Sequence, residues 1–109
     1  MELTGKCKEE FEKFYLKDID IDECEFFNND TILSIFYTEK ESMQYGVYVD
    51  FFDSVGFNIV IEQLDYQSWY NYRITNLVLL QFKGTKLSCR PKTRLLAIEK
   101  ANEIYNNAH

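Results

Sequence analysis

Apolar side chains recur every three or four positions near the start of the chain, and this spacing predicts a helix over residues 5–17. On such a helix they share one face, while the charged residues between them lie elsewhere. The apolar face consists of Leu3, Cys7, Phe11, Phe14 and Tyr15. Thr4 stands where a residue that caps the helix is expected.

Alternating apolar and polar residues then predict a series of β-strands. The predicted strands are 18–22, 23–26, 31–38, 47–52, 57–62 and a long last strand over 72–82. Polar turns separate them at 28–30, 39–42 and 53–56, and Gly56 in the last turn suits a positive φ. Several strands are apolar on both faces, so we expect part of the sheet to be covered on both sides.

A second helix is predicted after Pro91, a residue that favours the first turn of a helix. Its buried stripe would consist of Ala97, Ile98, Ala101, Ile104, Tyr105 and Ala108. Asn106 and Asn107 are expected to fray at its end. The chain therefore predicts one α+β domain over residues 1–109. Its architecture is a single antiparallel β-sheet of four to five strands with an N-terminal and a C-terminal α-helix packed on it.

The composition favours a packed core and removes several kinds of catalysis. Hydrophobic residues make up 46% of the 109 positions and aromatic residues 17%, enough for a core without metal or disulfide staples. The only histidine is His109, so a Ser–His or Cys–His pair would need the last residue to fold back. Three widely spaced cysteines, Cys7, Cys24 and Cys89, give neither metal-ligand spacing nor a disulfide framework.

We therefore predict a protein that is not an enzyme, needs no cofactor and holds no metal ion. A small carboxylate-dependent hydrolase is the alternative, because the chain has 18 acidic residues that could act in acid–base chemistry. The first residues lack a leader pattern, and no apolar run approaches the roughly 20 residues of a membrane span. We expect a soluble protein of the bacterial host cytoplasm, without a membrane partner.

The net charge of −6 conceals a strong asymmetry between the two parts of the chain. Residues 1–65 hold 16 acids and 5 bases, whereas residues 66–109 hold 7 bases and 2 acids. Such a split suggests a charged partner, although a folded chain can also place its two parts against each other.

An alternating run of acids follows the first helix, at Asp18, Asp20, Asp22, Glu23 and Glu25. A calcium-binding EF-hand loop needs Gly at its sixth position and Glu at its twelfth, but Glu23 and Asn29 stand there. Two interpretations stay open. The acids are either a solvated strand edge or a negatively charged surface that contacts a partner.

A basic stretch follows over residues 83–94, with no acid between Asp65 and Glu99. Its cations are Lys83, Lys86, Arg90, Lys92 and Arg94. They could neutralise the phosphates of a nucleic acid, or they could pair internally with the acidic part of the chain. We favour internal pairing, because a chain with a net negative charge repels bulk nucleic acid.

Aromatic residues crowd the segment 66–73, which contains Tyr66, Trp69, Tyr70, Tyr72 and Arg73. Tyr, Trp and Arg dominate the energetic centres of protein interfaces, because they combine a large area with a polar tip. The segment is therefore either a hairpin corner whose rings cover the sheet or an exposed recognition patch.

Residues 57–107 resemble, in layout and composition, small phage and prophage proteins of the helix–sheet–helix, ABA sandwich-like kind. The resemblance rests on the Trp- and Tyr-rich strand pair and on the closing helix at 94–101, Arg-Leu-Leu-Ala-Ile-Glu-Lys-Ala. It implies a mobile genetic element, where small acidic proteins often inhibit host machinery, anti-CRISPR proteins among them. No functional residue is carried over from it.

We therefore expect a protein-binding module, an anti-CRISPR-like inhibitor of a bacterial defence or nucleic-acid-processing enzyme. Its acidic first half would occupy the enzyme's basic groove, and the aromatic segment would anchor the contact. The alternative is an accessory protein that binds nucleic acid through the basic stretch 83–94.

Overall fold

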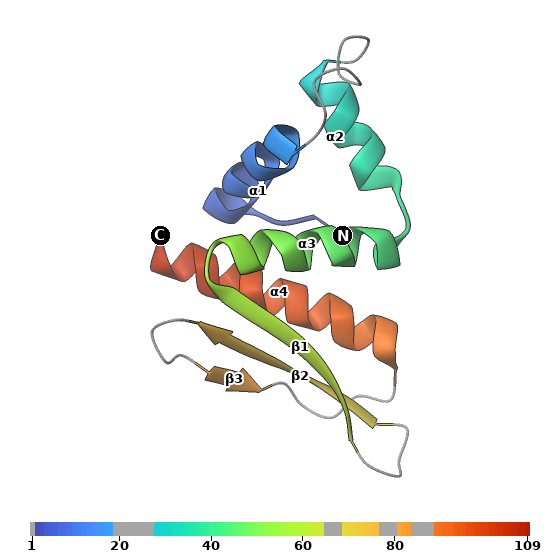
Figure 1. Cartoon of the computed structure of the whole chain (residues 1–109), viewed down its shortest axis with the longest axis vertical. Helices are drawn as coiled ribbons and strands as arrows, with labels where there is room; N and C mark the ends of the chain where they lie inside the picture. Colours follow the sequence, from blue (N-terminus) through green and yellow to red (C-terminus); the bar gives the residue numbers. More distant parts are fainter. Residues whose placement is uncertain (1, 19–27, 65–68, 77–80, 84–88) are drawn as a thin grey trace.

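The computed structural model describes residues 2–18, 28–64, 69–76, 81–83 and 89–109. These residues form four α-helices and a three-stranded antiparallel sheet, which confirms the predicted α+β class. In chain order the elements are α1 (Gly5–Asp18), α2 (Asn29–Thr38), α3 (Glu41–Ser54), β1 (Phe57–Leu64), β2 (Trp69–Asn76), β3 (Gln81–Lys83) and α4 (Arg90–Ala108). They stack in three layers along the 49 Å long axis: α1 with α2, α3 with α4, and the sheet (Figure 1).

The central strand of the sheet is β2, which pairs antiparallel with β1 on one side and β3 on the other. The β1–β2 register is unbroken over eight residues of each strand, from 57 opposite 76 to 64 opposite 69. Directly opposed residues project from the same face of a sheet. The face with Ile59, Tyr72 and Ile74 is buried in the core beneath α3 and α4. We call this the inner face, and the opposite one the outer face.

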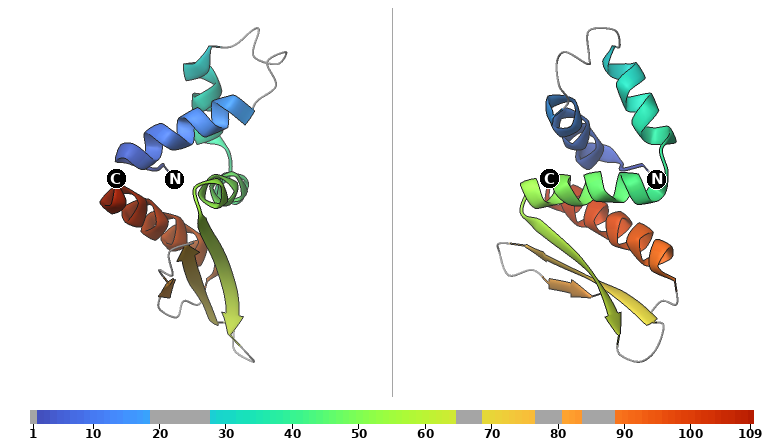
Figure 2. Two further views of the ribbon diagram at one scale, coloured as in Figure 1. Left: turned by 60° about the vertical axis from the view of Figure 1, so that its left-hand side comes forward. Right: turned by 45° about the vertical axis from the view of Figure 1, so that its right-hand side comes forward.

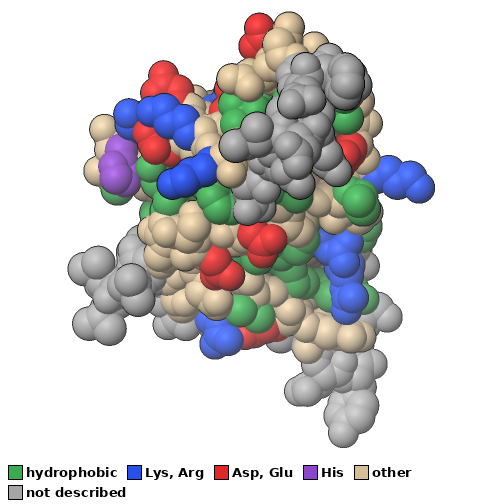
Figure 3. Space-filling model, turned by 45° about the horizontal axis from the view of Figure 1, so that its top comes forward, with side chains coloured by type: hydrophobic (Ala, Val, Ile, Leu, Met, Phe, Trp, Pro, Cys, Tyr) green, Lys and Arg blue, Asp and Glu red, His purple; other side chains and the backbone are tan. Residues whose placement is uncertain are grey.

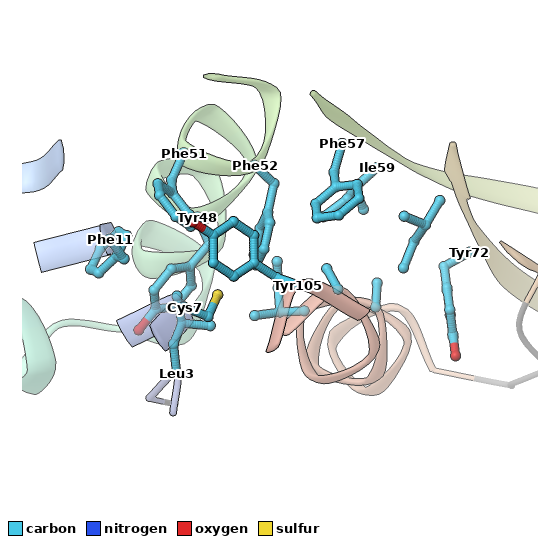
Figure 4. Packing of buried hydrophobic residues seen from close by; sticks show 14 of the residues in the cluster. Leu3, Cys7, Phe11, Tyr48, Phe51, Phe52, Phe57, Ile59, Tyr72 and Tyr105 are labelled. Carbon is cyan, nitrogen blue, oxygen red and sulfur yellow. The ribbon is translucent and has the colours of Figure 1, made fainter. Parts of the chain in front are cut away.

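One core, rich in aromatic rings, joins the three layers. The ring of Phe11 from α1 lies 4.8 Å from that of Tyr48 on α3 and 5.3 Å from that of Phe36 on α2. The rings of Phe52 and Phe57, 6.1 Å apart, continue the core from α3 into β1 (Figure 4). Offset or tilted pairs of this kind add about 0.5–1.5 kcal/mol each beyond the area that they bury.

Two segments predicted as strands are helices. Residues 31–38 lie in α2 and residues 47–52 lie in α3. In α3 the buried positions are 44, 48, 51 and 52, a helical spacing, and Asp50 is exposed where a strand would have buried it with 48 and 52. The predicted turn before α2 is its N-cap, because the Asn28 side chain accepts a 2.8 Å hydrogen bond from the Thr31 backbone N–H.

The predicted long strand over 72–82 is also wrong, because the chain turns back within it. Arg73 of β2 pairs with Lys83 of β3, and 75 pairs with 81, so both ends of the segment lie side by side. The strand at 57–62 is confirmed as part of β1. Gly56 has the expected positive φ, 92°, but it joins α3 to β1 and not two strands.

The first and last helices are confirmed as helices, and α4 packs on the sheet as predicted, whereas α1 packs on α2, α3 and α4. Two asparagines of α4 bind the start of α1, a set of contacts that we call the asparagine clasp. Asn106 of α4 accepts a 2.8 Å hydrogen bond from the Cys7 backbone N–H and donates one of 2.9 Å to the Thr4 carbonyl. Asn102 accepts from the Thr4 N–H at 2.9 Å. The expected fraying of Asn106 is therefore wrong. Most of the predicted stripe of α4 is buried or half-buried, but Ala108 is exposed.

The remaining strand predictions, 18–22 and 23–26, lie outside the described residues apart from Asp18, which ends α1. The expected cover on both faces of the sheet is not seen in the part of the chain that the structure describes. There α3 and α4 pack on the inner face, and α1 and α2 pack on the far side of that helix layer (Figures 1 and 2).

Candidate partner-binding surfaces

The outer face of the sheet carries an exposed tryptophan. The strand register places Trp69, Asn71 and Arg73 of β2 on this face, with Glu62 of β1 opposite Asn71 and Val60 opposite Arg73. The Trp69 side chain is 39% exposed, although Trp is among the largest apolar side chains and is usually well buried. This set, Val60, Glu62, Trp69, Asn71 and Arg73, is called the Trp69 patch below.

Next to the tryptophan lies an unsatisfied buried acceptor. Asn71 is only 8% exposed, and its Oδ1 receives no hydrogen bond from any described residue. A buried acceptor without a donor costs about 1–3 kcal/mol, so native proteins rarely leave one in this state.

The charges of the Trp69 patch are already paired with each other. The Arg73 guanidinium lies 3.0 Å from the Glu62 carboxylate, across the β1–β2 pair. Arg73 belongs to the basic part of the chain and Glu62 to the acidic part, so this pair is one instance of the predicted internal pairing. It leaves the Trp69 patch close to neutral.

The described tyrosines of the segment 66–73, Tyr70 and Tyr72, do not lie on the same face of β2 as Trp69. Tyr70 and Tyr72 alternate with it along β2 and therefore project from the inner face. Tyr72 is 7% exposed in the core, and burial, followed by the carboxylates of Glu103 and Glu99, raises its pKa. The assignment of Tyr72 to a partner surface is therefore wrong, because its ring belongs to the core, whereas that of the half-buried Tyr70 stays a prediction. Tyr66 lies outside the described residues.

The described member of the predicted acidic run, Asp18, does not lie beside Trp69. Asp18 ends α1 in the upper layer of Figure 1, whereas Trp69 begins β2 at the opposite end of the long axis. Asp20, Asp22, Glu23 and Glu25 lie outside the described residues. In the described part of the chain, the acidic residue and the exposed aromatic residue of the predicted binding surface therefore lie in separate parts of the molecule.

The basic stretch begins α4 and makes contacts with rings. The Arg90 guanidinium lies 5.1 Å from the ring centroid of Tyr70, and that of Arg94 lies 5.4 Å from the ring centroid of Tyr45. The side chains of Arg90, Lys92 and Arg94 form no ion pair with any described residue. The internal pairing that we favoured is therefore not seen for these three cations. Lys83 lies in β3, and Lys86 lies outside the described residues.

A hollow of about 190 Å³ opens beside these cations, where α3 and α4 begin. Its lining, which sequence reasoning did not anticipate, is Lys40, Glu41, Ser42, Pro91, Arg94 and Leu95. Lysine and arginine side chains gather over this end of the two helices, at the right of Figure 3. The signal in the sequence was weak, because Lys40 lies 54 positions before Arg94 and reads as part of a polar turn.

The described residues hold no group of three or more His, Cys, Asp and Glu side chains placed to bind one metal ion. Among the described residues that line the hollow, Glu41 is the one carboxylate. The carboxylate-dependent hydrolase that we named as an alternative would use a pair of carboxylates. No described helix has both the length and the apolar character that a membrane span requires.

No known protein family matches the chain, and neither a curated protein nor a solved structure shows significant similarity to it.

Proposed function

We propose that this protein is a binding module without catalytic activity, whose protein partner docks on the Trp69 patch. The observation that carries the proposal is the exposed Trp69 on a face that no described helix covers. A ring with few rotatable bonds and a polar edge gains more on burial than most side chains do, because little conformational entropy is lost.

The chemistry of the Trp69 patch favours one kind of partner surface. Since Arg73 and Glu62 neutralise each other, the patch attracts neither sign of charge strongly. A suitable partner surface has an apolar pocket for the indole ring of Trp69. Affinity would come from the desolvated centre of such a contact and not from its charged rim.

The class of partner that we propose is a bacterial enzyme that acts on nucleic acid, as expected of a phage-type inhibitor. Support for it comes from the net charge of −6, which steers the chain toward a positively charged groove. In this account the acidic part of the chain sets the association rate, and the Trp69 patch sets the lifetime of the complex.

A nucleic-acid-binding accessory protein is the second candidate. The observation in its favour is that Arg90, Lys92 and Arg94 form no ion pair with a described residue and lie together at one end of α4. Tyr70 beneath Arg90 adds a ring, although it is half-buried and less available for base stacking.

The test of the first candidate is capture of proteins from a nuclease-treated bacterial lysate on the immobilised chain. Trp69→Ala is compared with Met43→Ala, which truncates another exposed apolar side chain, 61% exposed, on α3. We expect Met43→Ala to leave the amount of captured protein unchanged. Trp69→Ala should lower that amount at least about tenfold. Equal capture by both variants would show that the Trp69 patch is not the docking site.

The second candidate is tested in parallel by the fluorescence anisotropy of labelled single- and double-stranded oligonucleotides at physiological salt. Arg90→Glu is compared with Lys13→Glu, the same charge reversal on an exposed residue of α1. We expect no binding by the unmodified chain. Binding that Arg90→Glu abolishes and Lys13→Glu preserves would establish the nucleic-acid candidate instead.

A further inference from the structure

The strand β1 is an open edge of the sheet. It pairs with β2 on one side, and in the described part of the chain no strand pairs with its other side. The left view of Figure 2 shows it as the outermost strand, with no helix beyond it on that side. Its outward backbone N–H and C=O groups are therefore available to another strand.

The sequence of β1 lacks the features that usually protect such an edge. Natural edge strands are kept apart by proline, lysine, bulges or extreme shortness. β1 reads Phe-Asn-Ile-Val-Ile-Glu-Gln-Leu, with no proline and no basic residue, and its register with β2 has no bulge over eight residues. The other edge strand, β3, has three residues, a length that by itself limits pairing.

We propose that a second copy of this chain pairs with β1, antiparallel and about a two-fold axis at Val60. In this register Val60 faces Val60 of the other copy, and Ile59 faces Ile61. Asn58 faces Glu62, so an amide that donates hydrogen bonds meets a carboxylate that accepts them. Each of these residues then meets a suitable partner on the same face, which favours a stable antiparallel pair.

The electrostatics of this register are favourable. Glu62 is the only charged residue of β1, and it is already paired with Arg73 at 3.0 Å. The axis at Val60 places no like charges directly opposite each other. The two three-stranded sheets become one continuous sheet of six strands, with both outer faces on the same side. The proposal does not depend on the proposed function, although it would place two Trp69 patches on one surface.

Analytical ultracentrifugation over about a hundredfold range of protein concentration tests the pairing, because a dimer dissociates on dilution. Val60→Lys places two ammonium groups opposite each other at the axis. Asn58→Lys is the matched control, because the same new charge then faces Glu62 of the other copy. We expect the unmodified chain to dimerise, Val60→Lys to weaken dimerisation about tenfold or more, and Asn58→Lys to preserve it.

Val60→Thr keeps the shape and β-branching of the side chain without a charge, so this variant should also dimerise. Circular dichroism of each variant shows whether the monomer fold survives, and Val60→Thr keeps the test decisive if Val60→Lys does not fold. A monomer at every concentration would overturn the proposal. Equal weakening by Asn58→Lys and Val60→Lys, or loss of the dimer in Val60→Thr, would overturn the register.

Discussion

The asparagine clasp between α4 and α1 makes a quantitative prediction for the variant Asn106→Ala. The Asn106 side chain takes the place of an N-cap for α1, because it accepts a hydrogen bond from the Cys7 N–H, one of the first-turn donors without a partner inside the helix. It also donates to the Thr4 carbonyl at 2.9 Å. Removing it breaks both bonds and leaves the Cys7 N–H unpaired in a partly buried place.

The magnitude follows from these two contacts. A hydrogen bond contributes about 0.5–1.5 kcal/mol net, and a partly buried donor left unpaired adds to the loss. The Thr4 carbonyl keeps a second partner, since it also accepts from the Lys8 N–H at 3.1 Å. We therefore expect Asn106→Ala to lower the free energy of unfolding by about 2 kcal/mol, in line with the loss of a strong helix cap.

The assay is equilibrium unfolding in urea followed by circular dichroism, with Asn107→Ala as the control. Asn107 is the next residue, and it is exposed, so its truncation should change the free energy of unfolding by less than about 0.5 kcal/mol. In a chain of this size the Asn106→Ala loss corresponds to a fall in the melting temperature of roughly 8 °C. If both variants are equally stable, α1 is not held by α4 as described.

Three further predictions concern the backbone, the helix α2 and the buried thiol. Gly5 has a φ of +59°, and an added Cβ would lie 3.2 Å from the Asn106 side chain, so Gly5→Ala should lower the melting temperature. Phe36→Ala, which empties a buried position, should lower the free energy of unfolding by about 3–5 kcal/mol. Ile35→Ala should lower it little, because Ile35 is 48% exposed. Equal losses of stability in the two variants would favour a strand over residues 31–38. Burial raises the pKa of Cys7 to about 12, so its thiol stays neutral at pH 8. Thiol reagents should therefore modify the exposed Cys89 well before Cys7, which mass spectrometry of the labelled chain will show.

Local patterns predicted the elements whose side chains follow one unambiguous period. The apolar face of α1, the stripe of α4 and the alternation in β1 each fit a single secondary structure, and each is confirmed. The failures at α2 and α3 arose where Tyr, Val, Ile and Phe fill adjacent positions, because such runs suit a strand by propensity and a helix by spacing.

The sites depended on information that a local pattern does not contain. Trp69 is exposed, as a recognition patch requires, but its separation from Tyr70 and Tyr72 follows from which face of β2 the helices cover, a tertiary choice. Lys40 reaches the same hollow as Arg94 only because α3 and α4 begin at the same end of their layer. The unsatisfied Asn71 Oδ1 could not be predicted at all without the neighbouring strand and its side chains.

The most direct test of the Trp69 patch uses the fact that Trp69 is the only tryptophan in the chain. Incorporating 5-fluorotryptophan gives a single ¹⁹F resonance that reports on this side chain in any mixture, whatever tryptophans the partner contains. If the partner docks on the Trp69 patch, the resonance of the captured and purified complex will shift from that of the free chain, and its sensitivity to solvent deuteration will fall. A resonance with unchanged shift and unchanged solvent sensitivity, in a complex whose size confirms that the chain is bound, would contradict the proposed function.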